Sequence, residues 1–250
     1  MKKPEKMHIL IFQHVAAEHV GRFGALLEAD GVRTKVVSLD QGEAIPELNG
    51  YDGLWVLGGP MQVWQEKEFP WLIAEKAAIR EAVVERQLPY FGLCLGHQLL
   101  ADSLGGEVGI SATPEVGVLP VTLTEAGRNS VFFKGAELNF NCIQGHGAEV
   151  KTPPAHSEVL AYSDRCSIQA LAYGHNTVSM QFHSELTLEM IDACLELPEY
   201  KADFEALLGL DGIEAFRKDC IKSVAMFDAD AKLVYQNWMK CATSENIVWR

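Results

Sequence analysis

Short apolar runs alternate with segments of helical periodicity through the first part of the chain. Each run is a few residues long and is bounded by glycine, proline or polar residues, as buried strands are. The runs predict strands at residues 7–12, 34–39, 54–57 and 89–93. Helical spacing predicts helices at residues 19–29 and 69–87, the second with Leu72, Ile79, Ala82 and Val83 on one face. This alternation predicts the α/β class, with an open, mostly parallel sheet flanked by helices.

The pattern changes from residue 115 onward, where β-rich segments predominate. They are residues 116–123, 138–143, 167–173 and 177–182, and the turn 174–176 joins the last two as a hairpin. Residues 188–250 are helical in pattern, and Asp211-Gly212 is the predicted break between two helices. We therefore expect one domain over residues 1–190 and a helical extension over residues 191–250 that packs on the same domain.

Cys94 stands at the end of an apolar run and before an amphipathic segment, between Gly92 and Gly96. This arrangement predicts a nucleophile elbow, in which a strand delivers the cysteine onto a tight turn that opens a helix. The unpaired N–H groups of a helix N-terminus favour a negatively charged thiolate there. The alternative is a buried core cysteine, because free cysteine is among the most buried residue types.

Residues 92–98, Gly-Leu-Cys-Leu-Gly-His-Gln, resemble the nucleophile motif of class I, triad-type, glutamine amidotransferases. A cysteine nucleophile needs a base and an orienting acid, and His183 and Glu185 stand two residues apart near the end of the β-rich region. In an extended segment their side chains point to the same side. We therefore predict a Cys94-His183-Glu185 catalytic triad. The resemblance implies a flavodoxin-like fold of the amidotransferase type.

Residues 52–60 run from a buried strand into a loop that ends in Gly58-Gly59-Pro60. Acyl chemistry needs backbone N–H donors near the developing oxyanion, and glycine lets the main chain approach a substrate. The family that the chain resembles places an oxyanion loop of this type after the corresponding strand. We predict Gly59 and Leu95 as the oxyanion donors and Gly58 as a substrate contact.

Residues 143–149, Ile-Gln-Gly-His-Gly-Ala-Glu, are similar to a His-Gly-Asp segment of the family, notably of its GMP synthetase type. In the family this segment helps to hold the α-amino and α-carboxyl ends of glutamine, so the resemblance implies that His146 and Gly147 bind substrate. Gln98 is expected to line the same pocket or to pack against the sheet. The sequence departs from the family at Ala148, in place of aspartate, and at Ser184, where proline is common.

The composition limits the partners of the chain. A length of 250 residues with 48% hydrophobic residues suffices for one substantial core, and the formal net charge is −13. This charge, without a basic stripe, argues against binding nucleic acid or anionic membranes. The six cysteines are scattered without metal-type spacing, and no apolar run is long enough to span a membrane. We expect a cytoplasmic protein without metal or cofactor.

Three functional hypotheses follow. The first is an amidohydrolase acting on glutamine, alone or with a separately encoded synthase that uses the ammonia. The second is a stand-alone γ-glutamyl peptidase or hydrolase, and the third is a non-catalytic docking or redox-sensing module. The sequence shows no P-loop and no pyrophosphatase loop, so we expect hydrolysis or transfer rather than ATP-dependent activation. A homo-oligomer is compatible with each hypothesis.

Overall fold

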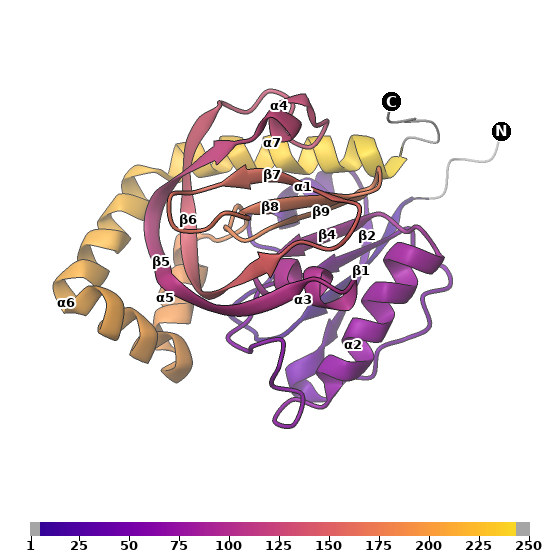
Figure 1. Cartoon of the computed structure of the whole chain (residues 1–250), viewed down its shortest axis with the longest axis horizontal. Coiled ribbons are helices and arrows are strands. Elements are labelled where there is room, and N and C mark those ends of the chain that lie inside the picture. The colour runs from indigo at the N-terminus through magenta and orange to yellow at the C-terminus, as the bar shows by residue number, and fades with distance from the viewer. Residues whose placement is uncertain (1–5, 244–250) are drawn as a thin grey trace.

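The computed structural model describes residues 6–243 and folds them around one mixed sheet (Figure 1). The strands are β1 (His8–Gln13), β2 (Arg33–Ser38), β3 (Gly53–Val56), β4 (Tyr90–Leu93), β5 (Glu107–Leu123), β6 (Asn139–Thr152), β7 (Ser157–Tyr162), β8 (Ala170–Tyr173) and β9 (Thr177–Met180). The helices are α1 (Phe23–Ala29), α2 (Trp71–Arg80), α3 (Leu95–Ser103), α4 (Glu125–Asn129), α5 (Leu188–Glu196), α6 (Pro198–Lys222) and α7 (Val224–Thr243). A 3₁₀ turn follows β2, and a π-helical turn continues α2.

The sheet has the strand order β2-β1-β3-β4-β9-β8-β7-β5-β6. The first five strands are parallel, and the remaining pairs are antiparallel. The hairpin predicted at residues 174–176 joins β8 to β9. In α/β sheets, ligands bind at the carboxyl ends of the parallel strands. The fold class is therefore confirmed, and the carboxyl ends of β1, β3, β4 and β9 are the edge to examine for a site.

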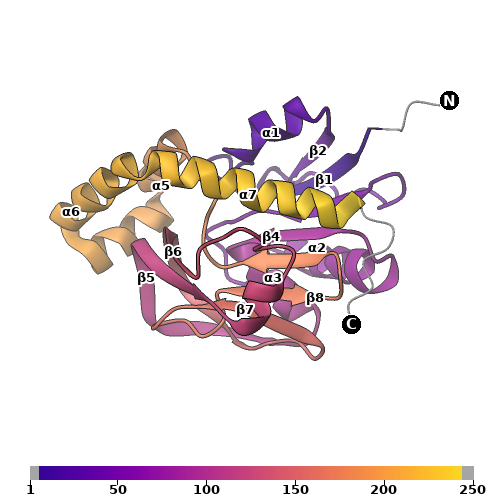
Figure 2. The ribbon, with the colours of Figure 1, turned by 90° about the horizontal axis from the view of Figure 1, so that it is seen from above.

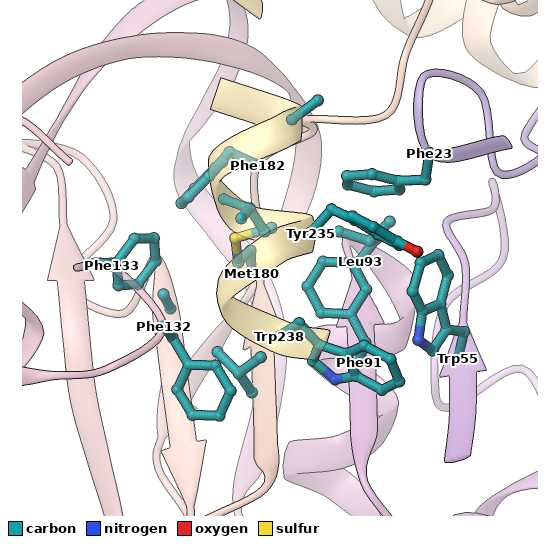
Figure 3. Close-up of a cluster of buried hydrophobic side chains, with 14 of the residues drawn as sticks. Phe23, Trp55, Phe91, Leu93, Phe132, Phe133, Met180, Phe182, Tyr235 and Trp238 are labelled. Atoms are coloured by element: carbon teal, nitrogen blue, oxygen red, sulfur yellow. The ribbon is translucent and has the colours of Figure 1, made fainter. Parts of the chain in front are cut away.

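Alternating side chains along the parallel strands supply two separate cores. On one face, Leu10, Leu54 and Tyr90 pack with α2 and α3. On the other face, Trp55 and Phe91 pack with α1 and α7 (Figure 3). Because both faces are covered, these strands read in the sequence as continuous apolar runs.

The antiparallel half and the C-terminal helices enclose one end of the sheet. The long strands β5 and β6 curve together at the side of the molecule where α6 lies (Figure 1). From α6 the chain returns as α7, which packs beside α1 and spans the sheet (Figure 2). No helix within residues 6–243 is both long and apolar enough to cross a membrane.

The structure corrects several predicted boundaries. Helix α1 begins at Phe23 rather than at residue 19, because Gly21 has a φ of +47°. The helical break that we predicted at Asp211-Gly212 lies at Gly209, which has a φ of +65°. Strand β7 was not predicted, and β5 begins at Glu107, well before the predicted residue 116.

Candidate active site

Cys94 occupies a strained turn between β4 and α3. Its φ of +49° and ψ of −103° lie outside the regions that a non-glycine residue commonly adopts, and its N–H donates to the Met180 carbonyl at 2.8 Å. A Cβ on Gly92 would lie 2.8 Å from the Gly96 carbonyl oxygen, and a Cβ on Gly96 would collide with the Val56 carbonyl. Both glycines are therefore required by close packing, and the turn has the geometry of a nucleophile elbow.

His183 and Glu185 lie beside this turn, beyond the end of β9. The His183 N–H donates to the Ile143 carbonyl at 2.9 Å, and its Nδ1 lies 2.6 Å from Glu185 Oε1. We predicted an extended strand here, whereas β9 ends at Met180 and His183 makes only an isolated bridge to β6. With Nδ1 bound to Glu185, Nε2 is the nitrogen available to Cys94.

The charge on His183 is set by three opposing influences. Burial alone would lower the pKa of the imidazole, but the Glu185 carboxylate and Cys94 raise it, and the resulting pKa is well above the ordinary value. Both the His183 and Glu185 side chains are almost completely buried. The protonated imidazole is therefore a stable species in this site, available to give a proton to a departing group.

The loop between β1 and α1 surrounds this pair, which our sequence reasoning missed. Oxygen atoms of Glu18 and Glu185 and a ring nitrogen of His183 lie within 4.8 Å of one another. The Tyr200 hydroxyl of α6 donates to Glu18 Oε1, while Glu18 Oε2 has no partner among the described residues. Burial raises the pKa of Glu18, against the lowering effect of His183 and Tyr200. The Arg22 N–H donates to the Glu185 carbonyl at 2.9 Å and so fixes the acid from behind.

The predicted oxyanion loop follows β3 and reaches the same edge. Gly59 lines a cavity together with Cys94, and a Cβ on Gly59 would lie 3.1 Å from the Leu95 side chain. Within residues 6–243, the N–H groups of Gly59 and Leu95 have no acceptor. Gly58 does not line the cavity, because its carbonyl oxygen lies 2.9 Å from Nδ1 of the buried His14.

The cavity above Cys94 has a volume of about 500 Å³. It contains four further residues that the sequence predicted, namely Gln98, His146, Gly147 and Gly59. The Gln98 Nε2 donates to the Ala148 carbonyl and to Gln181 Oε1, both at 3.1 Å. Gln98 is therefore both a lining residue and a brace between α3 and the β6 and β9 segments.

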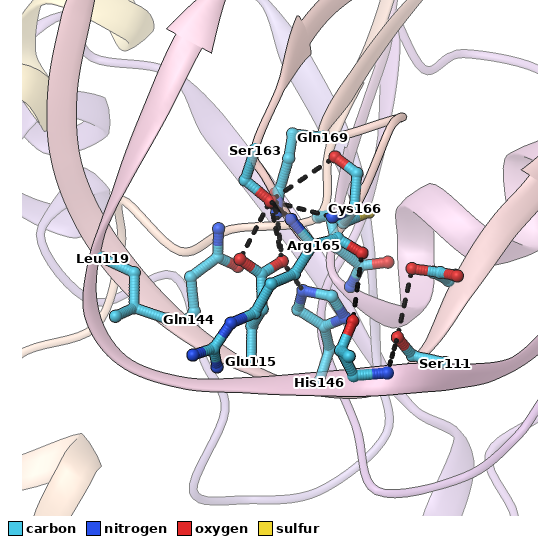
Figure 4. Close-up of polar contacts among 12 residues, drawn as sticks. Ser111, Glu115, Leu119, Gln144, His146, Ser163, Arg165, Cys166 and Gln169 are labelled. Carbon is cyan, nitrogen blue, oxygen red and sulfur yellow. Dashed lines mark hydrogen bonds and ion pairs between the residues drawn. The ribbon is translucent and has the colours of Figure 1, made fainter.

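His146 is held by a buried polar cluster behind the cavity wall (Figure 4). Its Nδ1 lies 2.9 Å from the Ala148 carbonyl, and its Nε2 lies 3.2 Å from Glu115 Oε2. Glu115 also accepts hydrogen bonds from Ser163 and Gln169. Possible metal-ligand atoms of Glu115, His146 and Cys166 lie within 4.8 Å of one another, and the carboxylate among them is already saturated with donors. The arrangement fixes the His146 ring against the cavity.

The fold and this site define a class I glutamine amidotransferase. The family model "Glutamine amidotransferase class-I" matches residues 24–195, and the chain belongs to this family. The predicted family is therefore confirmed.

Relatives in two groups resemble the chain. The glutamine-hydrolysing subunit of GMP synthase from Sulfurisphaera tokodaii is 33% identical over 140 residues, which are 56% of this chain and 70% of that protein. The glutamine amidotransferase-like protein YfeJ of Salmonella typhimurium is 30% identical over 196 residues, 76% of this chain and 80% of that protein.

Solved structures share the whole architecture. A glutamine amidotransferase from Thermotoga maritima superposes with a TM-score of 0.83 at 22% identity and covers 95% of this chain and 99% of its own. A glutamine amidotransferase from Methylobacillus flagellatus has a TM-score of 0.80 at 25% identity and covers 98% of each chain. Both likenesses extend over the helices that follow the family segment.

Proposed function

We propose that the protein hydrolyses the side-chain amide of glutamine, or a closely related γ-glutamyl amide, through a thioester on Cys94. The observation that carries this proposal is the strained turn at Cys94 beside the buried His183-Glu185 pair. Membership of the class I amidotransferase family supports it, as do relatives named as glutamine-hydrolysing subunits.

The chemistry begins when the Cys94 thiolate attacks the δ-carbonyl carbon and the carbonyl electron pair moves onto oxygen. The N–H groups of Gly59 and Leu95 stabilise this oxyanion, and each such donor is worth about 3–4 kcal/mol of barrier. The oxyanion collapses, the C–N bond breaks, and His183 gives its proton to the departing nitrogen. Ammonia or an amine leaves, and the γ-glutamyl group stays on sulfur as a thioester.

Water completes the reaction. Neutral His183, oriented by Glu185, accepts a proton from the water that attacks the thioester carbon. The C–S bond then breaks, glutamate is released, and Cys94 returns as the thiolate with His183 protonated. No electrons are transferred to another reagent, so the residues of the site are sufficient for the cycle.

Glutamate release from glutamine by the purified chain tests the proposal. We expect Cys94→Ala to abolish turnover and His183→Ala to reduce it by about 10²–10⁴-fold, with a smaller loss for Glu185→Gln. A diazo-ketone analogue of glutamine should label Cys94 selectively, because burial raises the pKa of the other five thiols. Selective labelling of Cys166 or Cys220 would contradict the assignment, and full activity of Glu185→Gln would reduce the triad to a dyad.

A second candidate is a stand-alone γ-glutamyl hydrolase, and the apolar mouth of the cavity favours it. Trp64, Ile110 and Leu207 line the cavity from three separate segments, and each is at least 45% exposed. Such side chains fit an apolar amine substituent beyond the scissile bond. Comparing glutamine with γ-glutamyl anilide distinguishes the two, and Leu207→Ala should weaken only the anilide reaction in the second case.

The same assay separates the remaining hypotheses. A chain that forms the Cys94 adduct without turning over any γ-glutamyl substrate would depend on a synthase partner, to be sought by co-purification. A chain that forms no adduct and shows no turnover would be a non-catalytic module.

A further inference from the structure

A buried histidine and a buried glutamate lie directly beneath the oxyanion loop, and the mechanism above uses neither. His14 follows the carboxyl end of β1, and Glu75 is on the apolar face of α2. Both residues are 0% exposed. His14 Nε2 lies 2.8 Å from Glu75 Oε1, and the imidazole stacks on Trp71. A buried charge pair is costly to desolvate, so its position next to the site calls for a physical account.

The other ring nitrogen of His14 reaches the loop itself. Nδ1 lies 2.9 Å from the Gly58 carbonyl oxygen. That carbonyl and the N–H of Gly59 belong to one planar trans peptide, in which C=O and N–H point in opposite directions. A donor on the Gly58 carbonyl therefore fixes the direction of the Gly59 N–H on the opposite side. Gly59 lines the Cys94 cavity on that side.

The loop needs such a restraint, because two consecutive glycines permit other orientations of the peptide between them. A Cβ on Gly59 would lie 2.8 Å from the His14 Cβ, so the histidine also packs against the glycine from below. Both partners of the imidazole, a carbonyl and a carboxylate, are acceptors, so both ring nitrogens donate when Glu75 is ionised. A charged donor on the carbonyl polarises the peptide and makes its N–H a stronger donor.

We propose that His14 is a positioning residue of the oxyanion hole, which aims and polarises the Gly58-Gly59 peptide, and that Glu75 holds His14 in place. This inference rests on the proposed function, in which Gly59 receives the oxyanion. It assigns the buried pair a role in the transition state and none in binding the substrate.

Two substitutions divide the contacts of His14. The amide nitrogen of asparagine occupies roughly the place of imidazole Nδ1, and that of glutamine roughly the place of Nε2. His14→Asn therefore retains the bond to Gly58 and loses the bond to Glu75, whereas His14→Gln does the reverse. We expect kcat to fall by about tenfold to several hundredfold in His14→Gln with little change in KM, within the effect of removing one oxyanion donor. His14→Asn should stay within about fivefold of the wild type.

Stability should follow the opposite order, because His14→Asn leaves the buried Glu75 without its partner. The core variant Leu27→Ala, in α1, is the control for lost stability alone. Alkylation of Cys94 by iodoacetamide forms no oxyanion, so its rate should be the same in the wild type and both His14 variants. Glu75→Gln is a second test that keeps the Nδ1 bond, and we expect it to lose less activity than His14→Gln.

Activity that follows stability, with His14→Asn less active than His14→Gln, would overturn the inference. Equal activity of both variants and the wild type would also overturn it, and the proposed function would stand. If wild-type turnover is absent, binding of glutamate γ-semialdehyde, whose adduct with Cys94 places an oxygen in the same hole, replaces the rate as the readout. Absence of both wild-type turnover and aldehyde binding would refute the proposed function and this inference with it.

Discussion

Individual residues around Cys94 owe their state to buried partners rather than to solvent. His183 pairs with Glu185, His14 pairs with Glu75, and Glu18 accepts from Tyr200. In each case a second group satisfies a polar atom that burial would otherwise penalise. Removing one partner therefore leaves a buried group unpaired, and its effect reaches stability as well as chemistry.

The His14-Glu75 pair makes folding stability depend on pH. Burial lowers the pKa of His14, but the charge and hydrogen bonds of Glu75, with contributions from the Gly58 carbonyl and Glu18, raise it above the ordinary 6.5. A pKa that is raised on folding gives stability that is fully present below pH 6.5 and is lost as pH rises through the folded-state value.

We expect the free-energy difference between the wild type and His14→Gln to be largest in mildly acidic buffer and to shrink above about pH 6.5. Urea denaturation at a series of pH values measures it. His175→Gln, in the β8–β9 turn, is the control for losing a histidine elsewhere. A difference that is independent of pH would mean that His14 is not held in its charged form.

Some site residues could be predicted from the sequence and others could not. Cys94, His183 and Glu185 belong to local motifs whose chemistry depends on spacing along the chain. His14 and Glu75 are 61 residues apart, and only the packing of α2 on the sheet brings them together. One signal was available, since Glu75 lies between Leu72 and Ile79 on the buried face of the helix.

At the scale of elements, α6 has two parts with different roles. Its first part carries Tyr200, Phe204 and Leu207, which line the cavity. The helix then kinks at Gly209, where φ is +65° and a Cβ added to the glycine would meet no atom within 4 Å. A substitution there therefore tests backbone conformation with little steric interference.

We expect Gly209→Ala to lower the free energy of unfolding by about 1–2 kcal/mol, because an alanine Cβ disfavours the left-handed conformation. Gly209→Asn should cost less, since asparagine enters this region more readily. Chemical denaturation gives both values. Loss-free alanine and asparagine variants would show that the helix can run straight through this position.

Elements differed in how far the sequence specified them. The parallel strands were predicted because burial on both faces makes them continuously apolar. Strand β7 was missed because its burial is mixed, with exposed and buried residues side by side. The helical break was placed at Asp211-Gly212 on turn propensity, yet Gly212 keeps a helical conformation and Gly209 takes the positive φ. Local propensity alone does not decide between two nearby glycines.

At the scale of the whole molecule, α7 is part of the central core. Trp238 packs with a ring-centroid distance of 5.2 Å to Trp55, and its Nε1 donates to the Tyr90 carbonyl at 3.1 Å. Tyr90 begins the strand that ends at the residue before Cys94. The predicted extension over residues 191–250 is thus tied to the nucleophile strand, which supports treating it as part of one domain.

We expect Trp238→Ala to lower the free energy of unfolding by about 3–5 kcal/mol, as the loss of a large buried aromatic side chain does. Thermal and chemical denaturation measure this loss. Trp64→Ala, at the exposed mouth of the cavity, is the matched control and should change stability little. An equal and small effect of both substitutions would mean that α7 is a dispensable cover.

The Cys94 N–H bond to the Met180 carbonyl has a consequence for how the site responds to heat. It places the nucleophile and the start of the base segment on neighbouring strands of one sheet, whose separation of about 4.8 Å is common to all sheets. The distance between the reacting groups is thus set by the spacing of the sheet and needs no closing motion. On warming, the two groups should stay in register until the sheet itself melts, so that catalysis and folding fail together.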